Sequence, residues 1–269
     1  MNALWNNTVM NLKLTFRDRQ AIFWTYVFPL FFLFLFSSIF ARGNAEAVLQ
    51  LLPGLLCISA MSAGLFGLSI GLVAARERGI LRRYQLAPFT PWMLITSELA
   101  ANFMVVLSTL ALQMALAKLI YHVSYAGNPL ALFVMLSAGV LAFQAIGFIV
   151  AAVAENAKAA QVLSNMLFFP LMFLGGAAFP LSMLPPAIRR FSRFLPSQYM
   201  VDGVGRVLGQ GESLRANALN LAVLLAVCAL ALLLAVKLFR WEAKTPLPWQ
   251  QKAWALALVG VLVLAAWWG

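Results

Sequence analysis

Two stretches without an ionisable side chain flank a short basic segment in this chain. The first covers residues 47–75 and the second covers residues 99–117. A run of 29 uncharged residues exceeds the roughly 20 that a helix needs to cross a bilayer. The segment between the two runs begins Arg76-Glu77-Arg78-Gly79-Ile80-Leu81-Arg82-Arg83. The sequence therefore predicts a membrane protein in which a compact basic island connects two spans.

The composition supports one integral membrane domain. The chain of 269 residues is 63% hydrophobic and 10% charged, with a mean hydropathy of +0.90. A water-soluble fold of this length could not cover that much apolar surface. The net charge of +11 does not indicate a nucleic-acid partner, because the basic residues lie at the ends of apolar runs, as in cytoplasmic loops. Cys57 and Cys228 lie inside apolar runs and are interpreted as buried thiols.

The hydropathy pattern predicts an all-α, polytopic membrane protein whose transmembrane domain covers residues 1–240. Each apolar segment is long enough, or nearly so, to cross a hydrocarbon core of roughly 30 Å at about 1.5 Å per residue. Six spans are expected, at residues 21–41, 48–75, 97–120, 129–154, 159–179 and 218–238. The C-terminal extension 241–269 holds a seventh apolar segment at 253–268. It is interpreted as a further span, with an interfacial or partner-packed helix as the alternative.

The distribution of lysine and arginine predicts a cytoplasmic N-terminus. With that orientation the first three inner segments carry eight basic residues, and the facing outer segments carry two. Short cytoplasmic loops are enriched in these residues. Before the first span, Trp5, Val9, Leu12 and Phe16 recur at helical spacing, which favours an amphipathic interfacial helix over an unstructured leader. We expect a multi-pass protein of the cytoplasmic (inner) membrane.

One region departs from this charge rule. Five arginines after the fifth span would lie outside, namely Arg189, Arg190, Arg193, Arg206 and Arg215. The charge-free stretch 159–188 has 30 residues, whereas two full spans would need about 40. Gly175-Gly176, Pro180 and Pro185-Pro186 supply helix breaks. The sequence therefore predicts one span followed by a re-entrant helical hairpin in the outer leaflet, with arginines reaching the lipid head groups.

Catalytic motifs are absent from the sequence. It has no G-x-S-x-G elbow, no H-E-x-x-H and no phosphate-binding G-x-x-x-x-G-K-[ST] loop. His122 is the single histidine, and a metal site would need several converging ligands. Glu98 and Lys118 are the ionisable residues nearest to a span interior, and both lie near span ends. We expect no catalytic residue, no metal site and no enzyme activity in this chain, and ion-coupled transport is disfavoured.

Small residues recur along span two at Ala63, Gly67 and Gly71. Spacing of four residues places them on one helix face, where small side chains let two helices approach closely. Packing within the subunit and packing between two subunits are both consistent with this pattern.

The basic island has more structure than a topology signal requires. Leu81, Tyr84, Gln85 and Leu86 follow the charges at helical spacing, and Pro88 ends the element before the third span. A short helix that is both charged and apolar suits docking into a groove of another protein, and arginine and tyrosine are favoured contact residues.

The sequence resembles the type-2 permease family of ABC transporters, which form the membrane half of ATP-driven exporters. Three stretches carry the resemblance: FRDRQAIFWTYVFPLFFLFLF entering span one, ARERGILRRYQLAP after span two, and the long segment from NMLFFP to DGVGRVL. The second stretch is similar to the family's E-x-G-x-L…L-x-x-P pattern. The third resembles the family's fifth span with its Gly-x-x-x-Pro exit and its closing Pro…Tyr…Asp-Gly…Arg pattern.

The resemblance implies a division of labour. Two permease subunits pair, as a homodimer, and each contacts one of two separate ATP-binding subunits, which hold ATP and Mg while this chain holds no cofactor. The contact to the ATPase is the coupling helix, formed by Arg76, Glu77, Arg78, Gly79, Leu81, Arg82, Arg83, Tyr84, Leu86 and Pro88. The exit gate is the outer hairpin, with Gly175, Gly176, Pro180, Pro185, Pro196, Tyr199, Asp202 and Arg206.

Spans one, two and five would line the substrate route. The expected cargo is amphiphilic or hydrophobic, of drug, lipid or glycan type, and it moves outward. Six phenylalanines are candidate walls or, alternatively, ordinary lipid-facing residues: Phe31, Phe32, Phe34, Phe36, Phe168 and Phe169. The rival hypothesis is a secondary transporter or channel without an ATPase partner, which an inverted repeat and intramembrane charges would favour.

Overall fold

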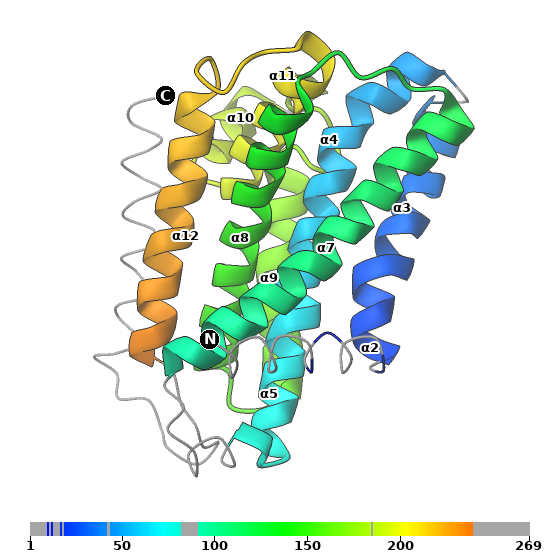
Figure 1. The fold of residues 1–269 in the computed structure, drawn as a ribbon. Coiled ribbons are helices and arrows are strands. Elements are labelled where there is room, and N and C mark those ends of the chain that lie inside the picture. The colour runs from blue at the N-terminus through cyan, green and yellow to red at the C-terminus, as the bar shows by residue number, and fades with distance from the viewer. Residues whose placement is uncertain are drawn as a thin grey trace.

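The computed structural model describes residues 10, 12, 17, 19–41, 44–81, 91–183 and 185–238, and within them all regular structure is helical. Figure 1 shows a bundle of long helices that run up and down between two ends. The all-α polytopic prediction is confirmed, because the described residues contain six helices long and apolar enough to cross a membrane. These candidate spans are Phe23–Ala41, Ala45–Glu77, Trp92–Tyr121, Pro129–Val153, Ala157–Leu174 and Ala218–Leu238.

The first two spans are built from alternating α and π segments. Span one consists of η1 (Phe23–Val27), α3 (Phe28–Phe36) and η2 (Ser37–Ala41), preceded by α2 (Arg19–Ile22). Span two consists of α4 (Ala45–Ser62), η3 (Ala63–Leu68) and α5 (Ser69–Glu77). Here η1, η2 and η3 are π-helical, a geometry found mostly as short inserts in α-helices and frequently at functional sites.

The remaining elements complete the bundle and one cap. The long helices are α7 (Pro91–Tyr121), α8 (Pro129–Val153), α9 (Ala157–Leu174) and α12 (Ala218–Leu238). Between α9 and α12 lie the short η4 (Leu181–Met183), α10 (Pro186–Ser192) and α11 (Pro196–Gln210). Figure 1 places α10 and α11 at one end of the bundle, here named the hairpin end, and the end of α5 at the other, here named the island end.

Two boundaries differ from the sequence prediction by five residues or more. The third span begins at Pro91 rather than 97, because proline is tolerated in the first turn of a helix, where its missing N–H is not needed. The fifth ends at Leu174 rather than 179, where Gly175 caps it and Gly176 has a φ of +82°. Most of the predicted N-terminal interfacial helix and all of segment 253–268 lie outside the described residues.

Asparagine side chains start three of the long helices. Asn44, Asn128 and Asn156 each precede a helix, and the side-chain oxygen accepts a hydrogen bond from a backbone N–H in the first turn. This capping satisfies one of the four orphan donors that every helix start exposes. It fixes where α4, α8 and α9 leave the short connections between spans.

The core forms where span two and α8 meet without intervening side chains. A methyl group on Gly64 would lie 2.6 Å from the carbonyl oxygen of Phe143, and one on Gly147 would overlap the carbonyl of Gly64. Close backbone approach of this kind is the usual use of small residues between membrane helices. The predicted stripe is offset from it: Gly67 meets only Thr25, 3.5 Å away, and Gly71 meets nothing within 4 Å.

The hairpin end is held by backbone acceptors. The Ser197 hydroxyl donates to the carbonyl of Leu171 over 2.8 Å, which ties the start of α11 to the end of α9. The Tyr199 hydroxyl donates to the carbonyl of Arg193, also over 2.8 Å. Tyr199 itself is 5% exposed. These bonds set α11 against the bundle and leave one of its sides to line the pocket described below.

Candidate functional site

Arg76 lies at the island end of span two, and its side chain turns into the protein. It is 6% exposed. Its Nη1 donates to the carbonyl of Ala151 over 2.9 Å, and its Nη2 donates to the carbonyl of Ala154. These carbonyls belong to the end of α8, where the last backbone acceptors have no partner within the helix. The guanidinium therefore caps α8, and its positive charge is favourable at the negative end of the helix dipole.

Glu77 caps the start of α9, the helix that follows α8. Its Oε1 accepts a hydrogen bond from the backbone N–H of Ala157, the first residue of α9, over 3.3 Å. A carboxylate at a helix start complements the positive end of the dipole. Two consecutive residues thus hold the end of α8 and the start of α9. This arrangement is named the double cap, and it fixes the connection 154–156 against the end of span two.

A tight turn follows the double cap. The N–H of Gly79 donates to the carbonyl of Arg76 over 3.0 Å, and Gly79 has a φ of +71°. Residues with a Cβ rarely adopt this conformation. Glycine is therefore the residue that lets the chain turn directly after α5.

The predicted coupling residues fall into three groups. Arg76 and Leu81 (2% exposed) are buried within this chain, so their side chains position the segment rather than present a surface. Glu77 and Arg78 are exposed at the island end, as is the adjoining Ile80 (40% exposed), which is not among the predicted coupling residues. The others, Arg82, Arg83, Tyr84, Leu86 and Pro88, lie outside the described residues.

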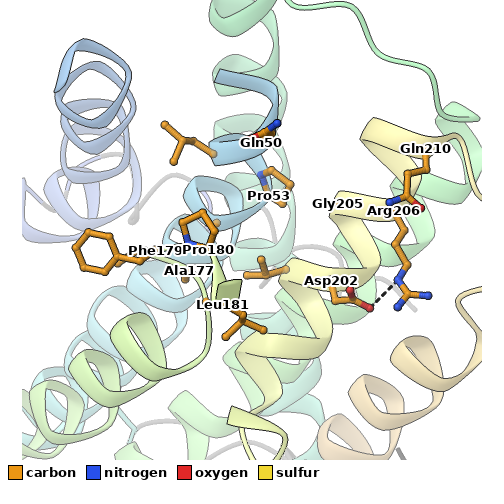
Figure 2. Close-up of a pocket in the computed structure, with 15 residues that line it drawn as sticks. Gln50, Pro53, Ala177, Phe179, Pro180, Leu181, Asp202, Gly205, Arg206 and Gln210 are labelled. Atoms are coloured by element: carbon orange, nitrogen blue, oxygen red, sulfur yellow. Dashed lines mark ion pairs between the residues drawn. The ribbon is translucent and has the colours of Figure 1, made fainter. Parts of the chain in front are cut away.

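A pocket of about 270 Å³ opens at the hairpin end. Figure 2 shows it between α4, the turn after α9, and α11. It is named the hairpin pocket, and most of its lining is apolar, with polar side chains from Gln50, Asp202, Arg206 and Gln210. Its apolar and small residues are Leu51, Pro53, Gly54, Gly176, Ala177, Ala178, Phe179, Pro180, Leu181, Val201 and Gly205.

The polar side of the hairpin pocket is part of a charge network centred on Asp202 and Arg206 of α11. Nε of Arg206 lies 2.9 Å from Oδ2 of Asp202, and its Nη1 lies 3.9 Å from Oε2 of Glu212. The amide of Asn220 on α12 donates to the same Asp202 oxygen over 2.8 Å. Figure 2 shows the Asp202–Arg206 pair beside the pocket. The pair is partly exposed, so it contributes little to stability, but it fixes the two charges relative to each other.

The structure brings together only part of the predicted gate. Gly176, Pro180, Asp202 and Arg206 line the hairpin pocket, and Tyr199 joins Asp202 and Arg206 in the lining of a second pocket between α11 and α12. The other three are structural: Gly175 caps α9, Pro185 precedes α10, and Pro196 begins α11.

Sequence reasoning missed the contribution of α4. Gln50, Pro53 and Gly54 line the hairpin pocket, and a methyl group on Gly54 would overlap the backbone of Ala177. The signal available in the sequence was a proline-glycine pair inside an apolar run.

Aromatic rings lead along span one toward this pocket. Trp24, Phe28, Phe32, Phe36 and Phe40 stand at every fourth position, with successive centroid separations of 4.9, 4.7, 5.2 and 5.6 Å. The ring of Phe40 then lies 6.1 Å from Phe179, which lines the hairpin pocket. The series from Trp24 to Phe179 is named the aromatic ladder.

The predicted phenylalanine walls divide between the ladder and the outer surface. Phe32 and Phe36 belong to the ladder, and Phe168 lies 6.0 Å from Phe28 between centroids. Phe31, Phe34 and Phe169 are exposed by 56%, 41% and 50%. Adjacent residues of one helix point to different sides, so half of the set faces away from the bundle.

No metal centre is present among the residues that the structure describes, since no three of their His, Cys, Asp or Glu side chains converge. The geometry is that of a membrane-embedded bundle with a braced island end and a pocket at the hairpin end. Comparison with known sequences identifies the family. The sequence matches the ABC-2 type transporter family over residues 2–207. The chain belongs to the ABC-2 type transporter family.

Three relatives illustrate the similarity. The probable multidrug ABC transporter permease YbhS of Escherichia coli K12 is 26% identical over 199 residues, which cover 73% of this chain and 51% of YbhS. The putative transport permease YvfS of Bacillus subtilis is 20% identical over 227 residues, covering 82% of this chain and 91% of YvfS. Nodulation protein J of Rhizobium leguminosarum is 29% identical over 100 residues, covering 37% and 38%. The chain spans about half the length of YbhS.

Proposed function

We propose that this ABC-2 permease is the membrane subunit of an ATP-driven exporter, powered by separate ATP-binding subunits docked at the island. The double cap supports the proposal most directly. Through Arg76 and Glu77, the segment that would contact the ATPase is fastened to the ends of α8 and α9 as well as to span two. A displacement of the island therefore acts on three spans together.

The proposed assembly has two permease subunits, arranged as a homodimer, and two ATP-binding subunits that hold ATP and Mg. The N-terminus and the island face the cytoplasm, and the hairpin end faces outward from the inner membrane. The coupling helix extends from Arg76 to Pro88. Within the described part of it, the exposed side chains of Arg78 and Ile80 would contact the ATPase. ATP binding would close the two ATPase subunits, and this closure would move the island.

The proposed cargo is an amphiphilic or hydrophobic molecule of drug, lipid or glycan type. The aromatic ladder gives an apolar track along span one, and aromatic faces bind apolar groups without demanding hydrogen bonds. The hairpin pocket then adds Gln50, Asp202, Arg206 and Gln210 to an apolar lining. A track that ends in a mixed pocket suits a molecule with an apolar body and a polar head.

A co-purification and transport experiment tests this function. The full chain is purified from native membranes, and the co-purifying ATP-binding subunit is identified and reconstituted with it in liposomes. Because YbhS is named a probable multidrug permease, lipophilic fluorescent dyes are the first probes. We expect dye movement with both subunits and ATP, and none with the chain alone. Dye movement by the chain alone would favour the secondary-transporter hypothesis.

A further inference from the structure

The hairpin end carries a surplus of positive charge. Between Gly175 and Asn220 the chain has five arginines and two acidic residues, which leaves a net charge of +3. In the proposed orientation this end faces outward, where basic residues are normally sparse. The surplus therefore calls for a local explanation.

A second pocket gathers part of this charge. It has a volume of about 280 Å³, far above the roughly 30 Å³ that a water molecule takes in the liquid. It lies between α11 and the start of α12 and is named the arginine pocket. Its lining includes Arg193, Tyr199, Asp202, Arg206, Leu219 and Asn220.

The one carboxylate in this lining is already occupied. Oδ2 of Asp202 accepts from Nδ2 of Asn220 over 2.8 Å and pairs with Nε of Arg206 at 2.9 Å. Much of the Arg206 charge is therefore balanced within the protein by Asp202. The second guanidinium in the lining, that of Arg193, leaves the pocket with a net positive charge.

Arg193 is placed by its backbone rather than by its side chain. Its carbonyl accepts the hydrogen bond from the Tyr199 hydroxyl over 2.8 Å, while the residue as a whole is exposed. Burial raises the pKa of the Tyr199 phenol, and the nearby Arg193 charge partly offsets this rise. Substitution of the Arg193 side chain therefore removes a charge from the pocket and keeps the bond that shapes it.

Exposed apolar side chains stand next to these charges. Leu219, in the pocket lining at the start of α12, is 47% exposed, and Phe191 on α10 is 51% exposed. Along α12 the exposed surface continues with Leu225 at 49% and Leu233 at 54%. A charged recess bordered by an apolar helix face matches an amphiphile with an anionic head, because arginine binds phosphate well and leucine side chains pack against acyl chains.

We propose that the arginine pocket binds the anionic headgroup of a membrane phospholipid. Arg193 contacts the phosphate, Arg206 adds the N–H donors that do not face Asp202 or Glu212, and the acyl chains lie along α12 from Leu219. The bound lipid would hold α11 against the start of α12. The proposal concerns a resident lipid and goes beyond the cargo and the ATPase of the proposed function.

Lipid titration of the purified full chain tests the site. The delipidated protein in detergent is titrated with phosphatidylglycerol and with phosphatidylcholine of the same acyl chains, and bound lipid is counted by native mass spectrometry. We expect preferential binding of phosphatidylglycerol. Arg193→Gln should weaken this binding about tenfold or more, since hydrogen bonds to charged groups are worth about 1.5–3 kcal/mol, and should leave phosphatidylcholine binding unchanged.

The matched control is Arg215→Gln, which removes the same charge from an exposed residue outside the pocket lining. It should change phosphatidylglycerol binding by less than about twofold. An equal loss in both variants would show diffuse attraction only and would overturn the proposal. Inorganic phosphate that displaces the lipid at equal concentration would also overturn it, because the site would then serve a free anion. The assay uses no nucleotide and no ATPase, so its failure is separate from failure of the proposed function.

Discussion

Arg76 and Glu77 are neighbours in the sequence, and their side chains cap opposite ends of two different helices. The cation of Arg76 meets the carbonyl end of α8, and the anion of Glu77 meets the amide start of α9. Each charge has the sign that the local helix dipole favours. The connection between α8 and α9 is therefore braced against the end of span two from both sides.

Loss of the Arg76 guanidinium should weaken the double cap. Arg76→Gln removes the donors that reach Ala151 and Ala154, and we expect a loss of roughly 1.5–3 kcal/mol in unfolding free energy. For a chain of this size that corresponds to about 2–4 °C in Tm per kcal/mol. Thermal unfolding in detergent measures it. Arg78→Gln, at an exposed neighbouring position, should change the unfolding free energy by no more than about 0.5 kcal/mol. Equal Tm shifts in both variants would contradict the stabilising role of the double cap.

Glu77 should matter through hydrogen-bond acceptance and through charge. Glu77→Ala loses the bond to Ala157 and should uncouple ATP hydrolysis from transport while the protein remains inserted. Glu77→Gln keeps an acceptor oxygen and should retain a large part of the coupling. The measurement is the ratio of transported dye to hydrolysed ATP in proteoliposomes. Normal coupling in Glu77→Ala would remove the double cap from the transmission path.

Gly79 and Gly71 form a matched pair for backbone strain. Neither has an atom within 4 Å of an added methyl group, but Gly79 has a φ of +71° and Gly71 lies inside α5. Gly79→Ala should therefore cost about 1–2 kcal/mol, whereas Gly71→Ala should gain about 0.5–1 kcal/mol. Opposite shifts in Tm are expected, and a bulky residue at 79 should also uncouple hydrolysis from transport. A stabilised Gly79→Ala variant would refute the turn geometry.

The spans were predictable because the length and position of a span can be read directly from its hydrophobic run. The asparagine caps and several prolines lie at the ends of these runs. The partners of buried polar groups were not predictable, since they depend on which helices become neighbours. Gln113, for example, donates to the carbonyl of Pro29 over 3.0 Å and lies 2.6 Å from the Ser59 hydroxyl. Likewise, the composition of the 76–83 segment indicated a contact surface, but only the fold turns Arg76 inward.

The small-residue pattern shows the same limit and gives a further prediction. Spacing drew attention to Gly67, whereas the backbone contact with α8 is made by Gly64. Gly64→Ala should push α8 away from span two and cost about 1–3 kcal/mol by overpacking. Gly67→Ala should be tolerated, because its methyl group would meet Thr25 at an ordinary 3.5 Å. Comparing the two Tm values decides which of the two glycines lies in the close contact with α8.

The orientation of the bundle can be read by cysteine labelling. Ile80 lies at the island end and Arg190 at the hairpin end, and both side chains are exposed. In intact cells Arg190→Cys should react with a membrane-impermeant maleimide, and Ile80→Cys should react only after the membrane is opened. The native Cys57 and Cys228 are buried and serve as the unlabelled background. Labelling of both positions from one side would break the six-span topology, and the reverse pattern would place the N-terminus outside.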